Sequence, residues 1–196
     1  MLPTHLVAPY ATPSTGREWR KPVAVRPILI YGDPRLEAPN EPVEQFDDGL
    51  QEIIRDLLDT GWKAPGLGLA APQIGLNLRL ATIDLSVGKD PEAPIVLANP
   101  EIVETEGKVS LEEGCLSFPG LFTTISRPRR LVVRAQDAHG EWRSIDADGL
   151  FAKAVCHEVD HLEGTLLVHH LRGMKRQMFM RRVAKMRKLG VWSTTA

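Results

Sequence analysis

The segment HEVDH at residues 157–161 decides which fold and which chemistry this chain is expected to have. Residues four apart lie on one face of a helix, so the two imidazoles would point toward the same spot. Residues 150–155 contain no helix breaker and Gly164 closes the segment, which favours a helix. Two histidines at this spacing also occur by chance in ordinary helices. The intervening Glu158, which can reach a water molecule at that spot, indicates a metal-activated hydrolase instead.

A third metal ligand is missing downstream of this segment. Past Glu163 the chain contains no Asp or Glu, so the carboxylate ligand of many zinc peptidases is excluded. Leu167 stands where the metzincin pattern has its third histidine, and His169 and His170 are out of register. We therefore interpret these two histidines as an exposed pair after a strand and exclude a zincin peptidase.

The two cysteines offer a better candidate. Cys156 adjoins His157 and points about 100° around the helix from it, which favours packing as a small apolar residue. Cys115 lies in EGCLSFPG at residues 113–120, where glycines and a proline suit a bent strand end. An isolated cysteine is usually a buried apolar residue. With two histidines, however, one cysteine completes a three-ligand site whose fourth position is open to water.

A glycine-rich segment, GLGLAAPQIG at residues 66–75, precedes both of these motifs. It formally fits the Gly-x-Gly-x-x-Ala dinucleotide fingerprint, but the helical spacing before it and Pro72 after it argue against the strand-to-helix turn required. It also lacks the Lys-Ser or Lys-Thr pair of a P-loop. One interpretation is that the glycines form a tight loop in which one backbone segment packs closely on another. Alternatively, they let the backbone approach a substrate, with the amide of Gln73 as a donor.

Together the three segments resemble the motifs of the peptide deformylases. That family carries Gly-x-Gly-x-Ala-Ala-x-Gln, Glu-Gly-Cys-Leu-Ser and His-Glu-x-x-Asp-His-Leu in this order, and the chain matches all three. The resemblance extends to residues 31–36, which are similar to the family's entry segment, and to Arg127; it spans residues 28–189. Cys156 departs from the glutamine that the family often has there, and residues 1–24 have no clear counterpart. Neither departure removes a catalytic group.

The resemblance implies a site for one divalent metal ion. Cys115, His157 and His161 would hold it, with a fourth position left open. Ligand softness alone suggests zinc, because cysteine and histidine both suit that ion. The resemblance instead implies Fe(II), with nickel or cobalt as competent substitutes, and we follow the resemblance.

Three charged residues would act without holding the metal. The resemblance implies that Glu158 is the general base and then the general acid. Glu113 and Arg127 would pair and fix the loop that carries Cys115. The implied reaction is hydrolysis of the N-formyl group from the amino-terminal formyl-methionine of newly made proteins, with release of formate.

Five residues would contact the substrate. By the resemblance, Gln73 and the backbone N–H of Leu116 would bind the formyl oxygen, as an oxyanion hole does. The backbone of Gly68, with Gly114 near the cleft, would pair with the extended peptide as an added strand. Leu67 would help to line the pocket for the methionine side chain.

Two other functions stay open beside deformylation. One is a hydrolase on the same scaffold with a different N-acyl or peptide substrate. The other is a non-catalytic module that binds ribosomes and carries a structural metal site. Closed structural sites use four protein ligands, and here no fourth ligand is apparent and Glu158 would be idle. Deformylation is therefore the function we expect.

Length and composition indicate a cytoplasmic enzyme of one domain. The 196 residues carry a formal net charge of −1, so electrostatics do not require DNA or another polyanion as partner. Two cysteines argue against a disulfide framework, and no apolar run reaches membrane-spanning length. We expect a loose extension at residues 1–24, without a secretory signal though open to organelle targeting. A single catalytic domain at residues 25–190 and a tail at 191–196 follow, in a monomer.

The expected elements describe an α+β fold, with small antiparallel β-sheets around a central metal-bearing helix and a helix near each end of the domain. Apolar spacing predicts helices at residues 46–61 and 174–188. His139-Gly140 would form a hairpin turn. Strands are predicted at residues 78–85, 95–99, 101–108, 121–125, 130–137, 141–148 and 165–169.

The carboxy-terminal segment at residues 171–188 is basic, with 8 lysines or arginines and no acidic residue. Met174, Met178, Val183 and Met186 offer a partial apolar face on which a helix could dock. Taken alone, the segment indicates a solvated basic helix. Family members with a carboxy-terminal helix use it to dock near the ribosomal exit tunnel, so the resemblance implies the ribosome as a partner.

Overall fold

The computed structural model describes residues 25–190 and residue 192, and within them the fold is α+β, as predicted. The expectations for residues 1–24 and for most of the tail lie outside the described residues. None of the helices that the structure describes is long and apolar enough to cross a membrane. The α-helices are α1 (Asp48–Lys63), α2 (Gly149–Leu162) and α3 (Gly173–Lys188).

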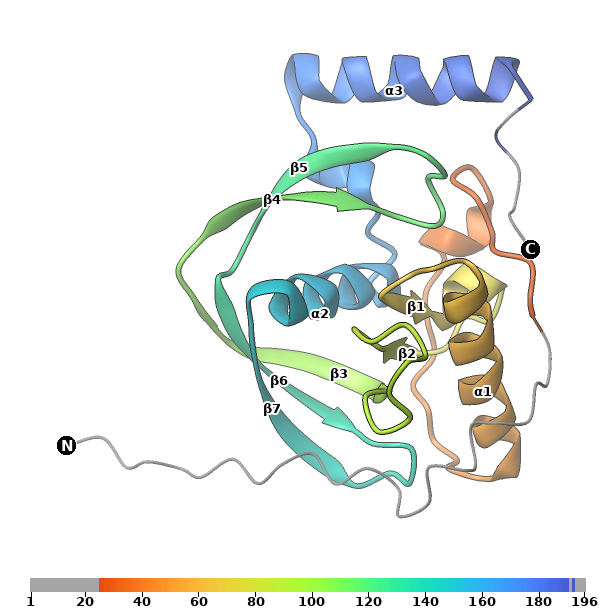
Figure 1. Cartoon of the computed structure of the whole chain (residues 1–196), viewed down its shortest axis with the longest axis vertical. Helices are drawn as coiled ribbons and strands as arrows, with labels where there is room; N and C mark the ends of the chain where they lie inside the picture. The colour runs from red at the N-terminus through yellow and green to blue at the C-terminus, as the bar shows by residue number, and fades with distance from the viewer. Residues whose placement is uncertain (1–24, 191, 193–196) are drawn as a thin grey trace.

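Two antiparallel sheets surround α2, which lies at the centre of the molecule (Figure 1). The larger sheet has the order β1-β2-β3-β6-β7, and the smaller one pairs β4 with β5. The strands of the larger sheet are β1 (Gly68–Ala70), β2 (Leu80–Ile83), β3 (Ile95–Glu106), β6 (Arg130–Gln136) and β7 (Trp142–Asp148). The smaller sheet consists of β4 (Val109–Gly114) and β5 (Phe122–Arg127).

Helix α1 begins at a well-formed cap and closes one side of the molecule. The side chain of Asp47 accepts a hydrogen bond from the Leu50 N–H at 3.0 Å, which satisfies one of the amides that a helix start leaves unpaired. The apolar face of α1, including Ile54 and Leu57, is buried against Leu69 and other residues of the larger sheet. This packing holds β1 in place beside the glycine-rich segment.

Helix α2 packs its apolar face on the larger sheet. Ala152, Val155 and Cys156 are buried against a cluster that includes Leu97 and Val133. Cys156 thus packs as a small apolar residue, and burial raises the pKa of its thiol to about 11. The opposite side of α2 faces the smaller sheet and carries the polar residues of the HEVDH segment.

Helix α3 lies over the β4–β5 sheet at the surface (Figure 1). Its buried residues are Phe179 and Val183. The Phe179 ring lies 5.5 Å from that of Phe118, between centroids. The predicted apolar face is therefore partly wrong, because Met174 and Met178 are exposed and the face turns toward Phe179 instead.

Several predicted strands differ from the structure. Residues 165–169 are not a strand: the His169 N–H bonds to the Leu166 carbonyl and the Leu171 N–H to the Val168 carbonyl, so this backbone pairs with itself, and a 3-10 helix, η4, spans Leu167–His170. The two strands predicted at 95–99 and 101–108 are one, β3, with a register shift between Ala98 and Glu101 where Asn99 has a φ of 52°. Strands β1 and β4 were not predicted. The hairpin between β6 and β7 turns at His139-Gly140, as predicted.

Candidate functional site

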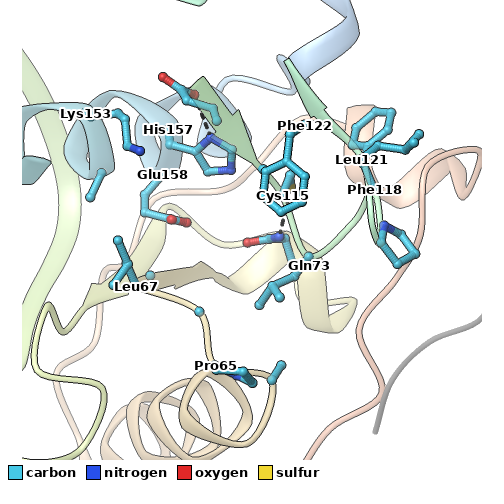
Figure 2. Close-up of a pocket in the computed structure, with 18 of the residues that line it drawn as sticks. Pro65, Leu67, Gln73, Cys115, Phe118, Leu121, Phe122, Lys153, His157 and Glu158 are labelled. Atoms are coloured by element: carbon cyan, nitrogen blue, oxygen red, sulfur yellow. Dashed lines mark hydrogen bonds and ion pairs between the residues drawn. The ribbon is translucent and has the colours of Figure 1, made fainter. Parts of the chain in front are cut away.

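A pocket of about 550 Å³ lies between α2 and two loops (Figure 2). Residues 64–68 form one wall, and residues 112–122 form another. The side of α2 that faces the pocket carries Lys153, Ala154, His157 and Glu158. These positions are one turn apart in pairs, so a single stripe of the helix borders the whole pocket.

The structure brings Cys115, His157 and His161 together, and the first two of them line this pocket. One ligand atom from each lies within 4.8 Å of the others, and Cys115 Sγ is 3.2 Å from His161 Nε2. The histidines come from successive turns of α2, while Cys115 follows directly after β4. The sequence spacing placed the two imidazoles on one helix face, and the strand end supplies the thiol from the opposite wall.

The chemistry of this cluster fits a divalent transition metal. Burial by itself raises the pKa of the Cys115 thiol, but His161 and His157 beside it hold that pKa well below its ordinary value. The thiolate is the form that binds metals. His157 Nδ1 lies 3.2 Å from Glu113 Oε2, which leaves its Nε2 for a metal, as a carboxylate behind a ligating histidine usually does. One thiolate and two oriented imidazoles suit iron, nickel, cobalt or zinc.

Glu158 lines the same pocket. Its side chain is 2% exposed, and Oε2 has no hydrogen-bond partner within the described residues. Burial raises the pKa of this carboxyl to about 7, which suits a group that takes up and releases protons near neutral pH. A Cβ at Gly68 would lie 2.5 Å from Glu158 Oε1, so only glycine at this position leaves room for the carboxylate.

Arg127 links the walls of the site through buried charges. It donates to both oxygens of Glu113, at 2.8 and 2.9 Å, and to Asp160 Oδ2 at 2.7 Å. Burial raises the pKa of Glu113, but the hydrogen bonds from Arg127 and His157 lower it to about 2. Glu113 therefore stays ionised at neutral pH and ties β4 to α2 through Arg127.

Asp160 extends this network and was missed in the sequence. Its Oδ2 also lies 2.6 Å from His170 Nε2. His169 accepts a hydrogen bond from the Leu166 N–H at 3.0 Å and pairs with Glu37. The two histidines are exposed, as expected, but they lie in the 3-10 helix η4 and do not follow a strand. In the sequence Asp160 directly precedes His161, and on a helix this position points its side chain away from the metal cluster. Its spacing therefore gave no reason to assign it a role in the site.

Gln73 is anchored so that its amide group faces the cluster. Its Oε1 accepts a hydrogen bond from the Ala70 N–H at 2.9 Å. Its Nε2 lies 3.2 Å from Ser117 Oγ and 3.7 Å from Cys115 Sγ. The bond to Ala70 fixes which end of the amide is the donor, so the N–H groups point toward the pocket.

The remaining predicted residues line the pocket walls. Leu67 and Gly68 lie on one wall, and Gly114 and Leu116 on the other. A Cβ at Gly114 would lie 2.6 Å from the ring of Phe122, so this glycine allows the ring to lie against the backbone. Strand β1 ends the larger sheet and β4 pairs with β5 alone, which leaves each with an unpaired edge among the described strands.

Sequence reasoning also missed Lys153, Phe122 and Ser117, which lie in or beside the pocket. Lys153 and Phe122 line it, and Ser117 contacts Gln73. Lys153 lies four residues before His157 and hence on the same helix face, a spacing that could have revealed it. Phe122 and Ser117 gave no such signal, because their neighbours in the site come from other elements.

Comparison with known proteins gives consistent results. Residues 25–177 match the family model described as polypeptide deformylase. A curated peptide deformylase from Acidobacterium capsulatum is 44% identical over 168 residues, which cover 86% of this chain and 99% of that protein. The crystal structure of a peptide deformylase from Legionella pneumophila matches with a TM-score of 0.80 and 44% identity, over 86% of this chain and 98% of the other. A Synechococcus elongatus peptide deformylase in complex with actinonin matches with a TM-score of 0.77 and 38% identity, over 84% and 90% of the two chains.

Proposed function

The chain belongs to the polypeptide deformylase family, and we propose that Cys115, His157 and His161 hold its metal ion while Glu158 moves the protons. The enzyme hydrolyses the formyl group from the amino terminus of newly made polypeptides and is metal-dependent. The observation that supports these roles is the position of Glu158, a buried carboxylate whose Oε2 has no hydrogen-bond partner among the described residues, beside a cluster of three candidate metal ligands.

The proton steps follow from the environment of Glu158. A divalent ion bound there would act as a Lewis acid and would lower the pKa of a water molecule towards about 7. Glu158 accepts the proton of the attacking water and returns it to the leaving amine, so the carbon–nitrogen bond breaks and formate forms. Its pKa of about 7 allows both transfers near neutral pH. Burial also keeps bulk water from competing for the same oxygens.

Two donors are proposed for the oxygen of the formyl group. The Gln73 amide is held by Ala70 with its N–H groups toward the pocket, and the backbone N–H of Leu116 follows the thiol on the same loop. Negative charge develops on the formyl oxygen when water adds to the carbonyl. Loss of one such donor typically costs about 100- to 1,000-fold in rate.

The substrate peptide is proposed to extend between the two unpaired strand edges. Gly68 on β1 and Gly114 on β4 would offer backbone groups to the peptide from opposite walls, as in recognition by strand addition. Leu67 would line the side of the pocket that receives the methionine side chain. Backbone pairing reads no side chain, which suits an enzyme whose substrates share only their first residue.

Formate release from formyl-Met peptides tests the assignment directly. The protein is purified without oxygen, and release of formate from formyl-Met-Ala-Ser is compared with release of acetate from the N-acetyl form of the same peptide. A deformylase releases formate from the first and leaves the second intact, because the formyl hydrogen occupies a place that a methyl group does not fit. Comparable turnover of both peptides would support the broader N-acyl hydrolase instead.

The metal is proposed to be Fe(II), in line with the resemblance of the motifs. Metal analysis of anaerobic protein checks its identity. Cys115→Ala and Cys156→Ala form a matched pair, because one thiol faces the cluster and the other is buried in the core. The first variant should lose metal and the second should keep it. A thiolate on iron should also be oxidised in air, with loss of activity.

The ribosome is proposed as the partner that delivers the substrate. Helix α3 presents exposed lysine and arginine side chains while Phe179 and Val183 anchor it to the domain. Such a surface suits phosphate groups of RNA, and nascent chains first become accessible at the ribosome. We further propose that the enzyme acts in the cytoplasm as a monomer.

A further inference from the structure

We propose that Lys153 is a specificity residue that lets this enzyme deformylate chains whose first side chain carries a strong hydrogen-bond acceptor, methionine sulfoxide above all. The inference rests on the proposed function, because it assigns the pocket beside Leu67 to the first side chain. It concerns peptides that already carry the sulfoxide, and the reaction remains hydrolysis of the formamide.

Lys153 lies at the end of the pocket away from His161. It precedes His157 by one turn, about 6 Å along the axis of α2, on the same face. In Figure 2, Lys153, Glu158 and Leu67 border one side of the pocket, while Phe122 and Leu121 lie on the other side. A formyl carbon beside Glu158 would therefore place the next side chain toward Leu67 and Lys153.

Lys153 is the one lysine or arginine among the pocket residues that the structure describes. Its Nζ donates to the Glu112 backbone oxygen at 3.1 Å. An ammonium group has three N–H donors, so this contact leaves two for another acceptor. Apart from Lys153 and the Glu158 carboxylate, which is an acceptor, this side is lined by Leu67, Gly68 and Ala154, which offer no side-chain donor.

Methionine and its sulfoxide differ in the strength of the acceptor they offer to this ammonium. The thioether sulfur is a weak acceptor, whereas oxidation adds to it an oxygen that is a strong acceptor and leaves the carbon chain unchanged. In a purely apolar pocket the sulfoxide oxygen would lose its hydration without a new partner. The Lys153 N–H groups supply that partner, so this pocket should accept both forms.

The contact with Glu112 also admits a purely structural role, since it joins α2 to β4. The two roles make different predictions. A structural link would affect every substrate alike. A specificity role changes the ratio between substrates, and mainly through KM, because the sulfoxide oxygen is distant from the reacting carbon and is bound equally before and during the reaction.

The test compares three peptides that differ only in the first residue: formyl-Met-Ala-Ser, its sulfoxide and the formyl-norleucine form, in which a methylene group replaces sulfur. For the wild type, the ratio of kcat/KM for the sulfoxide to that for norleucine is measured first. In Lys153→Met that ratio should fall by about tenfold, as expected for loss of one hydrogen bond to a charged group. Lys153→Arg should retain most of it, and Lys108→Met controls for the loss of one exposed positive charge outside the pocket.

The outcomes separate this inference from the proposed function. An unchanged ratio in Lys153→Met, or an equal loss on all three peptides, would overturn the specificity role while deformylation stands. A wild-type protein that releases no formate from formyl-Met-Ala-Ser would contradict the proposed function itself. Circular dichroism and metal content of each variant show that the comparison is made between folded, loaded proteins.

Discussion

Helices α2 and α3 are of similar length, but α2 buries charged side chains whereas α3 exposes them. In α2 the side chains of Glu158 and His161 are buried, and Asp160 is paired with Arg127. In α3 the lysines and arginines are exposed, and the buried residues are the apolar Phe179 and Val183. Charges removed from water change their pKa values and depend on each partner, whereas exposed charges interact mainly with the solvent and with what arrives from it.

This difference indicates where each kind of function is located. The groups around α2 are suited to chemistry, because burial raises the pKa of Glu158 to about 7, whereas hydrogen bonds from Arg127 and His157 outweigh burial and lower that of Glu113 to about 2. The exposed cations of α3 are suited to attraction of a partner over a distance. Substitutions in and around α2 should therefore change stability or turnover, whereas substitutions on α3 should change the binding of a partner. The expected effects follow from the largest to the smallest.

Arg127→Met should have the largest effect on stability. It leaves the carboxylates of Glu113 and Asp160 without their cation, and breaking a buried pair in this way costs about 3–5 kcal/mol of unfolding free energy. Urea unfolding of the metal-free protein measures the change. Arg181→Met on α3 is the matched control and should stay within about 0.5 kcal/mol. Equal costs for the two variants would contradict the contrast between the helices.

Glu158→Ala should lower turnover by roughly 100-fold or more while metal binding remains, because this carboxylate is proposed to carry protons rather than to hold the ion. Metal stoichiometry and formate release are measured on the same preparation. Glu163→Ala, at the end of the same helix and half exposed in its pair with Arg79, should retain activity. Loss of metal from Glu158→Ala would reassign that residue as a ligand.

Neutralisation of Arg176, Arg181 and Arg182 on α3 to glutamine should weaken co-sedimentation with ribosomes at low salt. The slope of log affinity against log salt should fall by about 1 for each cation removed. Cleavage of free formyl peptides should be preserved. Removal of all residues after Gly173 is a poorer test, because it also deletes Phe179 and uncovers Phe118. Ribosome binding equal to that of the wild type would indicate that α3 is only a solvated basic helix.

The smallest effect is expected at Asp84, a buried carboxylate outside both helices. Burial raises its pKa, but hydrogen bonds from the N–H groups of Ser86 and Gly88 and from Trp62 Nε1 outweigh burial and lower it. The folded-state pKa thus lies below the unfolded one. Its contribution to stability is present above the unfolded value, near 3.9, and is lost as the pH falls through the folded one.

Asp84→Asn removes this titration and tests the sign. The difference in unfolding free energy between wild type and variant should shrink as the pH falls from 6 towards about 3. Urea unfolding at several pH values measures it. A difference that grows on acidification would show that the sign of the shift is wrong.

The sequence was sufficient for those features that depend on local spacing. The helix at α2, its two histidines on one face and the hairpin at residues 139–140 follow from periodicity and turn residues. Strand β4 does not, because two consecutive acidic residues, Glu112 and Glu113, read as solvent-exposed. Glu113 is buried only because Arg127, 14 positions along the chain, pairs with it. Long-range pairing of this kind has no signature in a single sequence.

The same limit applies to the site. The three metal-ligand candidates were found by residue type and motif order, and the roles of Gln73, Leu67 and Gly68 came from a resemblance of motifs. Lys153 was missed although its helical spacing to His157 was available. Its significance depends on the walls opposite, and these come from other parts of the chain.

The unpaired edges of β1 and β4 also bear on how the protein behaves at high concentration. Open strand edges can template pairing with other chains, which leads to aggregation. Here β1 has only 3 residues, between Pro65 and Pro72, and β4 ends at Gly114 beneath the ring of Phe122. The short edge of β1 can accept the amino terminus of one extended peptide. It offers too little backbone for a second folded copy to build a continuous sheet, so an open cleft at β1 is compatible with a protein that does not polymerise through this edge.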